Sequence, residues 1–400
     1  MTDYTGASAI VIGGSIGGLT TALLLQDLGF TVDVYERTAT ALDSRGSGIV
    51  LQPDTVRWFT ERSTQNLADL STSTSYVQYL DRTGDLVYRE ECTWTYTSWG
   101  TFYRALLADF NSSAGAEHYH YGEYACGFDQ LDGQGSVRFV SGRVESADLV
   151  VFADGVTSVA RERFDADAGL HYSGYVGWRG TIPLRDLDAT TRDVLHDAIT
   201  YDVIPNSHIT MYPIPGENGL SLDDRLMNYV WYRNVSAGPD LTEMCIDKRG
   251  IPGSVSVHPG QVQDRYVTQM KRDAVELLAP AVAEAVTATE KPYLQVISDA
   301  RSSRMAIGRI ALIGDAACAA RPHAAAGTAK AAADGWALAA ALAEAGGDIP
   351  AALTKWEPAQ LHLSDSLLRR VVAMGERSQF TNTWTPGDPD LRFGLYGPGR

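Results

Sequence analysis

The sequence predicts an α/β protein of two structural parts, a parallel sheet flanked by helices and a mixed β-sheet inserted into it. Three observations lead to this prediction. A strand, a glycine turn, a helix and a second strand follow one another between Ala9 and Tyr35, which is the order of a βαβ unit. Two more apolar runs, Leu149–Phe152 and Ile310–Ile313, each end in a polar turn. Between them lie longer stretches rich in Trp, Tyr, Thr and Ile, which are typical of a mixed or antiparallel sheet.

The first unit follows from local patterns. Ala9–Ile12 is a short apolar run that ends in glycines, as a buried parallel strand does. Leu19–Leu28 has helical spacing and stops at Gly29, and Thr31–Tyr35 is predicted to be the next strand. The two later apolar runs are predicted to be buried strands of the same kind, whose carboxyl ends carry functional loops.

The inserted sheet and the later helices follow in order. Its predicted strands are Gly174–Pro183, His208–Pro215 and Leu226–Val235. Helices are predicted at Gln263–Ala288, with a break at Pro280, at Ala324–Ala345, and at Leu353–Met374, where Pro358 must start or kink the helix. The tail from Thr381 is rich in Pro and Gly and should be irregular.

Charge and cysteine usage exclude several classes of function. The formal net charge of -16 and a pI near 4.9 argue against binding to nucleic acid and to an anionic membrane surface. The four cysteines are too scattered for a redox pair or a zinc knuckle, so no metal site is expected and a reducing cytoplasm is favoured. No signal peptide and no membrane-spanning segment is predicted.

The glycine turn of the first unit carries the clearest chemical signal. In Gly13-Gly14-Ser15-Ile16-Gly17-Gly18, Gly13 is expected at the tight turn and Gly18 where helix and strand touch, while Ser15 replaces the middle glycine of the usual pattern. A helix that begins here offers free N–H groups and a partial positive charge to a pyrophosphate. Glu36 closes the second strand at the spacing of a carboxylate that accepts ribose hydroxyls. The turn therefore predicts a dinucleotide site.

Two further segments narrow the choice of dinucleotide. Asp154–Arg161 has an Asp-Gly followed by a Ser and an Arg, and Gly314-Asp315-Ala316-Ala317 is followed by Pro322 and Gly327. With the glycine turn, these segments resemble the three fingerprints of class A FAD-dependent aromatic monooxygenases. The resemblance implies that Asp315 binds the ribityl chain of FAD and that the next helix N-terminus faces the pyrimidine end of the flavin, where it stabilises the reduced anion.

The resemblance covers nearly the whole chain, from Ile10 to about Phe393, and is strongest to the members that hydroxylate hydroxypyridines. It is carried by Gly46–Pro53, Gly174–Gly180, Tyr212–Gly216 and Arg321–Gly327. The chain departs from the family pattern at a few positions where the family has Leu, His, Gly and Asn, namely Asn111, Cys318, Ala325 and Ala329. Backbone contacts with a cofactor can survive these changes.

The resemblance implies a fold and a division of the chain. The fold is Rossmann-like and similar to para-hydroxybenzoate hydroxylase, with an inserted mixed β-sheet substrate domain and C-terminal helices. Residues 1–75, 100–168 and 295–348 are expected to form the discontinuous FAD-binding domain, 76–99 and 169–294 the substrate domain, and 349–400 a C-terminal helix and irregular tail.

It also implies an activity. NADH or NADPH and O₂ would be used to hydroxylate an electron-rich ring of the hydroxypyridine or phenol type through a flavin C4a-hydroperoxide. FAD would be bound tightly and without a covalent bond, and the nicotinamide transiently, since no second glycine fingerprint is evident. The residues expected to contact FAD are Gly13, Ser15, Ile16, Gly18, Glu36, Arg37, Gln52, Arg104, Asp154, Gly155, Asp315, Pro322 and Gly327.

The substrate hydroxyl must lose a proton to activate the ring, so a base or a chain of hydrogen bonds is expected nearby. His208, Tyr212 and Tyr229 are the candidates, with His323 as the next one. Because alternate side chains of a strand share a face, one face of the last predicted strand should pack on helices, while the other could cover a flat aromatic substrate. The side chains expected on one face are Met227, Tyr229, Trp231 and Arg233.

Two alternative functions compete with the hydroxylase. A flavin-dependent halogenase would carry Trp-x-Trp-x-Ile-Pro, whereas Trp178–Pro183 lacks the second Trp. A non-catalytic FAD-binding redox sensor would show no product when reduced nicotinamide is consumed. The aromatic substrate, the ring position, the choice between NADH and NADPH, and the assembly, with a homodimer as one alternative, stay open.

Overall fold

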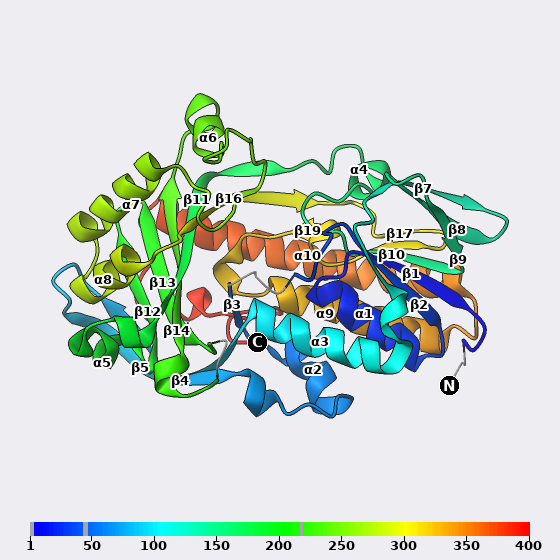
Figure 1. Cartoon of the computed structure of the whole chain (residues 1–400), viewed down its shortest axis with the longest axis horizontal. Helices are drawn as coiled ribbons and strands as arrows, with labels where there is room; N and C mark the ends of the chain where they lie inside the picture. Colours follow the sequence, from blue (N-terminus) through cyan, green and yellow to red (C-terminus); the bar gives the residue numbers. More distant parts are fainter. Residues whose placement is uncertain (1–3, 43–46, 217–218) are drawn as a thin grey trace.

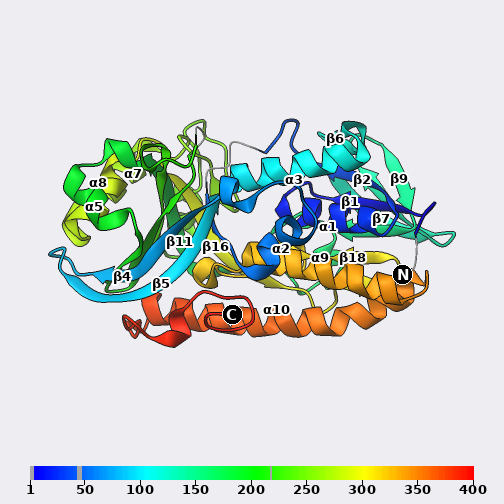
Figure 2. The ribbon, with the colours of Figure 1, turned by 90° about the horizontal axis from the view of Figure 1, so that it is seen from below.

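The computed structural model describes residues 4–42, 47–216 and 219–400. Gly46, the first residue of one of the segments that carry the resemblance, lies outside these ranges. The molecule is elongated, with a helix-flanked parallel sheet at one end and a second, larger sheet at the other (Figure 1). The long helix α10 (Ile349–Gln379) runs along both parts, as the view from below shows (Figure 2).

The first sheet has six strands in the order β17-β18-β10-β1-β2-β6. All neighbouring strands are parallel except β17 and β18, and the four predicted strands are confirmed within a residue at each end. Helix α1 (Ile16–Asp27) packs against α3 (Trp99–Ala114) and α9 (Gly327–Glu344) beside this sheet. The strands are β1 (Ser8–Ile12), β2 (Thr31–Glu36), β6 (Tyr119–Tyr121), β10 (Leu149–Phe152), β17 (Ala306–Ile307) and β18 (Ile310–Leu312).

The second sheet has ten strands, nine of them in the order β15-β16-β11-β14-β13-β12-β4-β5-β3, with β19 (Cys318–Ala319) paired to β16. The predicted strands correspond to β11 (His171–Pro183), β13 (Ser207–Ile214) and β14 (Leu226–Asn234). The others are β3 (Gly48–Val50), β4 (Thr72–Leu80), β5 (Leu86–Ser98), β12 (Ala198–Ile204), β15 (Ser256–Val257) and β16 (Tyr293–Arg301). A separate three-stranded sheet is made of β7 (Ala125–Leu131), β8 (Gln134–Phe139) and β9 (Val144–Ala147).

The second sheet has two different faces. Its helix-covered face packs against α5 (Ala189–Leu195), α7 (Asp264–Leu277) and α8 (Pro280–Ala288), and it carries the side chains of Val176, Trp178, Ile209, Met211, Met227, Tyr229 and Trp231. The opposite face, here called the inner face, carries Tyr175, Arg179, His208, Tyr212, Asn228 and Tyr232, which alternate with those residues along the same strands.

Two predicted helices differ from their expected form. Helix α9 begins at Gly327 instead of Ala324, because Pro322–Ala324 forms a 3₁₀ turn and Ala325 has a left-handed φ of 50°. Helix α10 begins at Ile349, where Asp348 accepts a hydrogen bond from the Ala351 amide at 3.1 Å. Pro358 therefore lies inside a continuous helix and does not start it. The break at Pro280 and the irregular tail are confirmed, apart from a single 3₁₀ turn in the tail.

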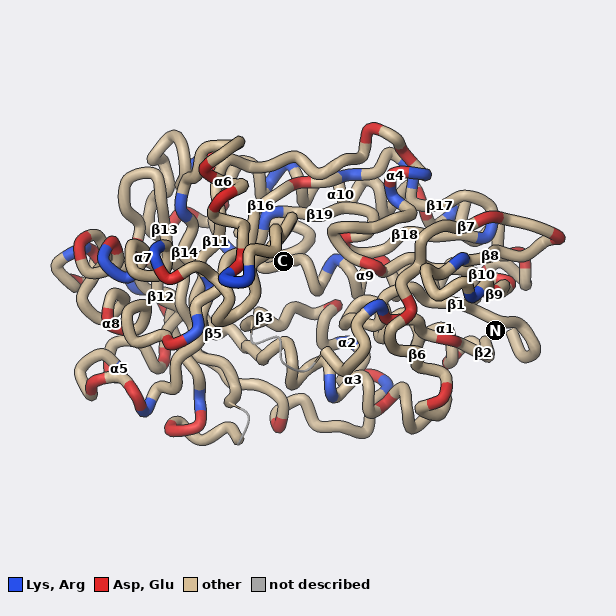
Figure 3. Tube along the Cα trace, turned by 45° about the horizontal axis from the view of Figure 1, so that its top comes forward, with Lys and Arg blue, Asp and Glu red and all other residues tan. Residues whose placement is uncertain are grey.

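Lys and Arg are scattered among Asp and Glu along the trace of both parts (Figure 3). Among the described helices, none combines the length and the apolar character needed to cross a bilayer.

Candidate active site

The turn after β1 can be built only from glycines at two positions. Gly13 has φ +104°, and a Cβ atom there would lie 2.3 Å from the Ala153 carbonyl oxygen. A Cβ on Gly18 would lie 1.9 Å from the carbonyl oxygen of Gly13. The Cβ on Gly18 would also lie 3.4 Å from Val11 Cγ1 of β1, so the predictions of a tight turn at Gly13 and of a helix–strand contact at Gly18 are confirmed.

The N-terminus of α1 is free of side-chain caps. Ser15 is the N-cap but makes no capping hydrogen bond, and no acidic residue lies in the first turn, which starts at Ile16. Its unpaired N–H groups and the helix dipole form a site for an anion.

Glu36 holds the glycine turn from the next strand. Its Oε2 accepts a hydrogen bond from the Gly14 amide at 3.0 Å, and its Oε1 accepts one from the Thr38 amide at 2.9 Å. The side chain is only 5% exposed, so these contacts are buried. Glu36 therefore fixes the turn as well as offering its remaining lone pair to a ligand.

The turn after β10 is held by an arginine. Arg161 is buried and donates to four backbone carbonyl groups, those of Val156, Ala168, Asp315 and Ala316. It thereby ties the turn after β10 to the turn after β18. Asp154 accepts from the Val159 amide at 3.0 Å, while its Oδ1 has no partner among the described residues. Burial raises the pKa of the Asp154 carboxyl.

The turn after β18 carries one accessible carboxyl group between two buried residues. Asp315 is exposed although Gly314 and Ala316 on either side are buried. Desolvation by the surrounding protein nevertheless raises the pKa of its carboxyl. Beneath it, the buried Lys330 forms an ion pair of 2.5 Å with Asp334 of the same helix.

The loop before α9 is held from two sides. Gln52 donates from Nε2 to the carbonyl oxygens of Ala325 at 2.8 Å and Ala324 at 3.3 Å, and its buried Oε1 has no partner in the described chain. The Gly394 amide of the tail also donates to Ala324, at 3.1 Å. Nothing lies within 4 Å of a Cβ placed on Gly327, so the N-terminus of α9 faces open space.

Two predicted cofactor residues lie on the outside of this region. Arg37 is exposed and donates to Thr157 Oγ1 at 3.0 Å, which links the turns after β2 and β10. Arg104 of α3 is exposed, and its side chain donates a long hydrogen bond of 3.4 Å to Thr101 Oγ1.

The predicted cofactor segments meet at one edge of the parallel sheet. Strands β1, β10 and β18 are neighbours, so the turns that follow them lie side by side. The edge combines a glycine turn without room for side chains, two uncapped helix N-termini and two unpaired buried acceptors, on Asp154 and Gln52. This donor and acceptor set fits a dinucleotide with a pyrophosphate, ribose hydroxyls and an amide-bearing ring.

The inner face of the second sheet offers polar groups beside this edge. The Asn228 Oδ1 accepts a hydrogen bond from the Gly48 amide at 2.9 Å, while its buried Nδ2 has no partner among the described residues. Tyr212 stacks on Tyr96 with 4.6 Å between ring centroids. A Cβ on Gly48 would lie 2.6 Å from the Tyr212 ring, so glycine lets strand β3 approach this face. Burial raises the pKa of Tyr212 to about 12, so its hydroxyl is a donor at neutral pH.

His208 lies on the same face in an aromatic cluster. Its ring stacks on Trp384 of the tail, with 4.5 Å between centroids, and Tyr232 lies 4.7 Å away. Burial lowers the pKa of His208 to about 3, so the imidazole is neutral. His323 lies next to it and shares a 2.7 Å hydrogen bond with Tyr175 Oη. Burial holds the pKa of His323 well below its usual range.

The third predicted catalytic residue is separated from the other two. Tyr229 lies on the helix-covered face with Met227 and Trp231, and its hydroxyl group points toward Gly180 and Thr289. The shared direction of these residues is confirmed, and Arg233 joins them by pairing with Asp273 of α7. The expectation that Tyr229 acts beside His208 and Tyr212 is corrected, because Tyr229 pairs with Met211 of β13 and shares its face, whereas His208 and Tyr212 lie on the opposite face.

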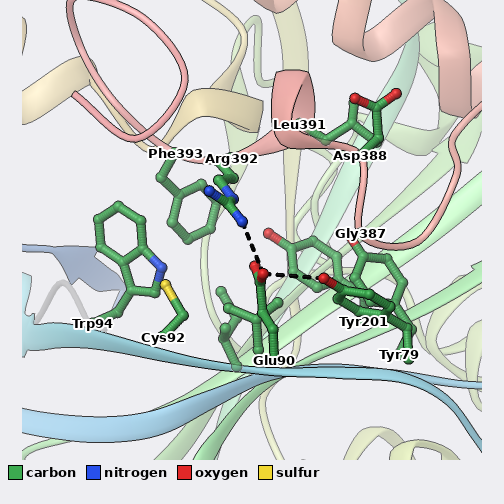
Figure 4. A pocket seen from close by; sticks show the side chains of 13 residues that line it. Tyr79, Glu90, Cys92, Trp94, Tyr201, Gly387, Asp388, Leu391, Arg392 and Phe393 are labelled. Carbon is green, nitrogen blue, oxygen red and sulfur yellow. Dashed lines mark hydrogen bonds and ion pairs between the residues drawn. The ribbon is translucent and has the colours of Figure 1, made fainter.

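A small, partly open cavity of about 30 Å³ lies elsewhere, between the sheet and the tail (Figure 4). The Glu90 carboxylate accepts hydrogen bonds there from Arg392 at 2.8 Å and from Tyr88 Oη at 3.0 Å. The volume is far below the roughly 150 Å³ of a cavity that binds benzene, and none of the predicted site residues lines it. The labelled lining residues are Tyr79, Glu90, Cys92, Trp94, Tyr201, Gly387, Asp388, Leu391, Arg392 and Phe393.

Three residues of the site were missed as candidates from the sequence. Arg161 belongs to a motif that was recognised, but its four carbonyl partners come from turns that fold together. Asn228 and Arg179 lie on predicted strands, next to Tyr229 and Trp178, whose side chains face the helices. Because adjacent side chains of a strand point to opposite faces, this position could have identified both residues as facing the site.

Comparisons with known proteins agree with this geometry. Residues 172–299 match a family model described as FAD binding domain-like. The chain is 37% identical to 2,6-dihydroxypyridine 3-monooxygenase of Paenarthrobacter nicotinovorans, over 96% of this chain and 95% of the relative. It is 25% identical to 6-hydroxynicotinate 3-monooxygenase of Pseudomonas fluorescens, over 96% and 94%. The solved structure of 2,6-dihydroxypyridine-3-hydroxylase from Arthrobacter nicotinovorans superposes with a TM-score of 0.92, at 36% identity and 99% and 98% coverage.

Identity at this level over nearly the full length of both chains establishes the family. The edge of the parallel sheet, which suits a dinucleotide, and the polar inner face beside it are consistent with that family. The chain belongs to the class A FAD-dependent aromatic monooxygenases, flavoenzymes that hydroxylate an aromatic ring with reduced nicotinamide and O₂.

Proposed function

We propose that this protein hydroxylates a hydroxylated pyridine, with 2,6-dihydroxypyridine as the first compound to test and phenols as the wider class. The observation that carries the proposal is the end-to-end similarity to a hydroxypyridine monooxygenase, together with an inner face that holds donors suited to ring oxygens or a ring nitrogen. Those donors are the Asn228 amide and the Tyr212 hydroxyl.

FAD would be held at the edge formed by the three strand-end turns. The α1 N-terminus at Ser15 and Ile16 would bind the pyrophosphate, and Glu36 an adenosine ribose hydroxyl. Asp154 and Asp315 would accept from the ribityl side, with Gly155, Pro322 and Gly327 giving the backbone room to approach. Arg37 and Arg104, both exposed, would screen the phosphates. Bound FAD supplies electron transfer from the nicotinamide and activation of O₂.

The protein's own groups would orient the ring and exclude water. The Asn228 amide and the Tyr212 hydroxyl would donate to its oxygens, and the loop at Ala324 would form the opposite wall. The tail seals the inner face, since Trp384 and Phe393 pack into the same core as Tyr212. Exclusion of water matters here because a reactive oxygen species that meets water is lost as hydrogen peroxide.

His208 and Tyr212 stay the proposed proton-handling pair. A neutral imidazole can accept a proton, although a pKa of about 3 makes His208 a weak base on its own. Tyr212, with a pKa raised to about 12, would donate a hydrogen bond to a ring oxygen and would not remove its proton. We therefore propose that they complete a hydrogen-bond chain to an oxygen that is already largely ionised.

The test is the ratio of hydroxylated product to reduced nicotinamide consumed, over a panel of hydroxypyridines and phenols. His208→Ala and Tyr212→Phe should lower that ratio while flavin reduction persists, whereas Tyr229→Phe, on the helix-covered face, serves as the matched control. No product from any compound would contradict the proposed activity. Normal coupling in both variants would instead place the proton chain elsewhere, with His323 next to be tested.

We also propose where the protein works and how it assembles. The four cysteines are free thiols in the structure, which suits the reducing cytoplasm. NADH or NADPH is proposed to bind transiently at the surface of the FAD edge. Light scattering of the holoenzyme tests a homodimer against a single chain.

A further inference from the structure

Arg179 is a cation on the inner face without an acidic partner. It lies on β11 between Trp178 and Gly180, whose positions face the helices, so its own side chain faces the site. Its Nε donates to Gln295 Oε1 at 2.7 Å, which fixes the direction of the guanidinium. Among the described residues, no carboxylate oxygen lies within 4.0 Å of a guanidinium nitrogen of Arg179, the distance limit for an ion pair.

The strand register places this cation beside the proposed substrate contacts. Arg179 is opposite Tyr293 on β16 and Val230 on β14. Asn228 lies two residues along β14 from Val230 and is opposite Tyr212 on β13. Side chains two residues apart on one face are separated by about 7 Å. A guanidinium on its long stem can therefore reach the space above Asn228 and Tyr212.

The electrostatics of the neighbouring phenols agree with this placement. Burial raises the pKa values of Tyr212 and Tyr232, and the charge of Arg179 acts on both hydroxyl groups in the opposite direction. The third phenol on this part of the face, Tyr293, contacts Ser47 Oγ with its hydroxyl. The titratable groups that face Arg179 are thus phenols, and no carboxylate of the described residues pairs with its charge.

Asn228 adds a donor whose direction is fixed. Its Oδ1 accepts from the Gly48 amide, which fixes the plane of the side-chain amide, and its Nδ2 lies close to Gly48 and the Tyr212 ring, where it has no hydrogen-bond partner in the described chain. The residue is 2% exposed, and a buried donor without an acceptor costs free energy unless a ligand supplies one.

We propose that Arg179 and Asn228 receive the ionised ring oxygen of the substrate, so that the enzyme selects the aromatic anion over its neutral form. This inference rests on the proposed function and names the charge state that the site takes. A guanidinium is always charged and weakly hydrated, which suits it to a delocalised ring oxyanion. The substrate hydroxyl gives its proton to solvent on binding, and the retained electron pair makes the ring carbon more nucleophilic.

The experiment uses the oxidised holoenzyme without nicotinamide, so that binding is separated from turnover. 2,6-Dihydroxypyridine is titrated across pH, and the Kd and the ionisation of the bound ring are read from its absorbance. Arg179→Gln should weaken binding about 10- to 150-fold, as expected for a lost charge-assisted hydrogen bond. It should also move the pH midpoint of bound-ring ionisation upward by about 1 unit or more. Arg179→Lys, which keeps the charge but not the planar fork, should restore the midpoint in part.

Two controls isolate the anion. Arg185→Gln removes an equal charge from an exposed arginine of the same part of the chain and should leave Kd and midpoint unchanged. 2,6-Dimethoxypyridine cannot ionise, so its weak binding should be the same in wild type and Arg179→Gln. An unchanged midpoint in Arg179→Gln, or an equal loss with the dimethoxy compound, overturns the assignment. If product forms normally in that variant, only the role of Arg179 fails, whereas no product in wild type with intact anion binding contradicts the proposed activity alone.

Discussion

The substitution Gly327→Ala should have opposite effects on two quantities, the stability of the apoprotein and its affinity for FAD. Gly327 is the first residue of α9, its φ is outside the left-handed region, and a Cβ there would meet nothing within 4 Å. The apoprotein should therefore accept the methyl group without strain. The substitution should even stabilise it by about 0.4–1 kcal/mol, because alanine restricts the unfolded chain more than glycine does.

The holoprotein should respond in the opposite direction. If the open space at the α9 N-terminus holds the flavin, the new methyl group overpacks that contact at a cost of about 1–3 kcal/mol. This corresponds to an FAD Kd raised by roughly 5- to 150-fold. Apoprotein stability is measured by urea unfolding, and the Kd by titration of flavin fluorescence.

Gly169→Ala is the matched control, since a Cβ at Gly169 also meets nothing within 4 Å and its φ is outside the left-handed region. Gly169 lies two residues before β11 and belongs to none of the three strand-end turns, although the carbonyl of the neighbouring Ala168 accepts from Arg161. It should leave FAD affinity unchanged. Equal FAD affinity in the Gly327 variant and its control would refute the placement of the flavin beside α9.

Three further predictions concern residues that hold the site. Arg161→Lys cannot reproduce the fork that reaches four carbonyl groups, so the urea midpoint should fall by the equivalent of about 1.5–3 kcal/mol; an unchanged midpoint would argue that the turns hold without it. Glu36→Ala leaves the Gly14 amide unpaired and should lower apoprotein stability by about 1–3 kcal/mol, with a smaller loss for Glu36→Gln, whereas equal losses in the two variants would contradict a hydrogen-bonding role. Burial raises the pKa of Asp202 to about 6 from its usual 3.8, so the folded state binds the extra proton and stability falls as pH rises from about 4 to 6. Asp202→Asn should flatten that slope, add about 1–3 kcal/mol at pH 7, and keep the acceptor for the Ala279 amide; an unaltered slope in urea unfolding across pH would contradict it.

The parallel sheet and its turns could be predicted from the sequence because their signals are local. Gly13 and Gly18 are required by contacts within one βαβ unit, and β10 is a run of four apolar residues that is buried from end to end. Helix α9 was predicted three residues too long at its start, since the left-handed φ of Ala325 depends on the loop that Gln52 and the tail hold in place.

The substrate face could be predicted only in part. Alternation correctly grouped Tyr229 with Met227 and Trp231, but which face the helices cover depends on the packing of α7 and α8. The inner face joins residues from strands that are distant in sequence, so Arg179 and Asn228 become neighbours only when β11, β14 and β13 pair. Most of the long β4–β5 hairpin, which pairs with that sheet through β12, lies in the segment 76–99 assigned to the substrate domain, but its two strands were not predicted.

The central claim is that the protein inserts one atom of O₂ into an aromatic ring. The most direct measurement is the mass of the product formed from 2,6-dihydroxypyridine and NADH or NADPH under ¹⁸O₂. The product should be a hydroxylated ring that carries one ¹⁸O atom, with the second ¹⁸O atom in water. Two results would contradict this activity. One is consumption of reduced nicotinamide that yields hydrogen peroxide but no ring product, and the other is a product whose new oxygen comes from water.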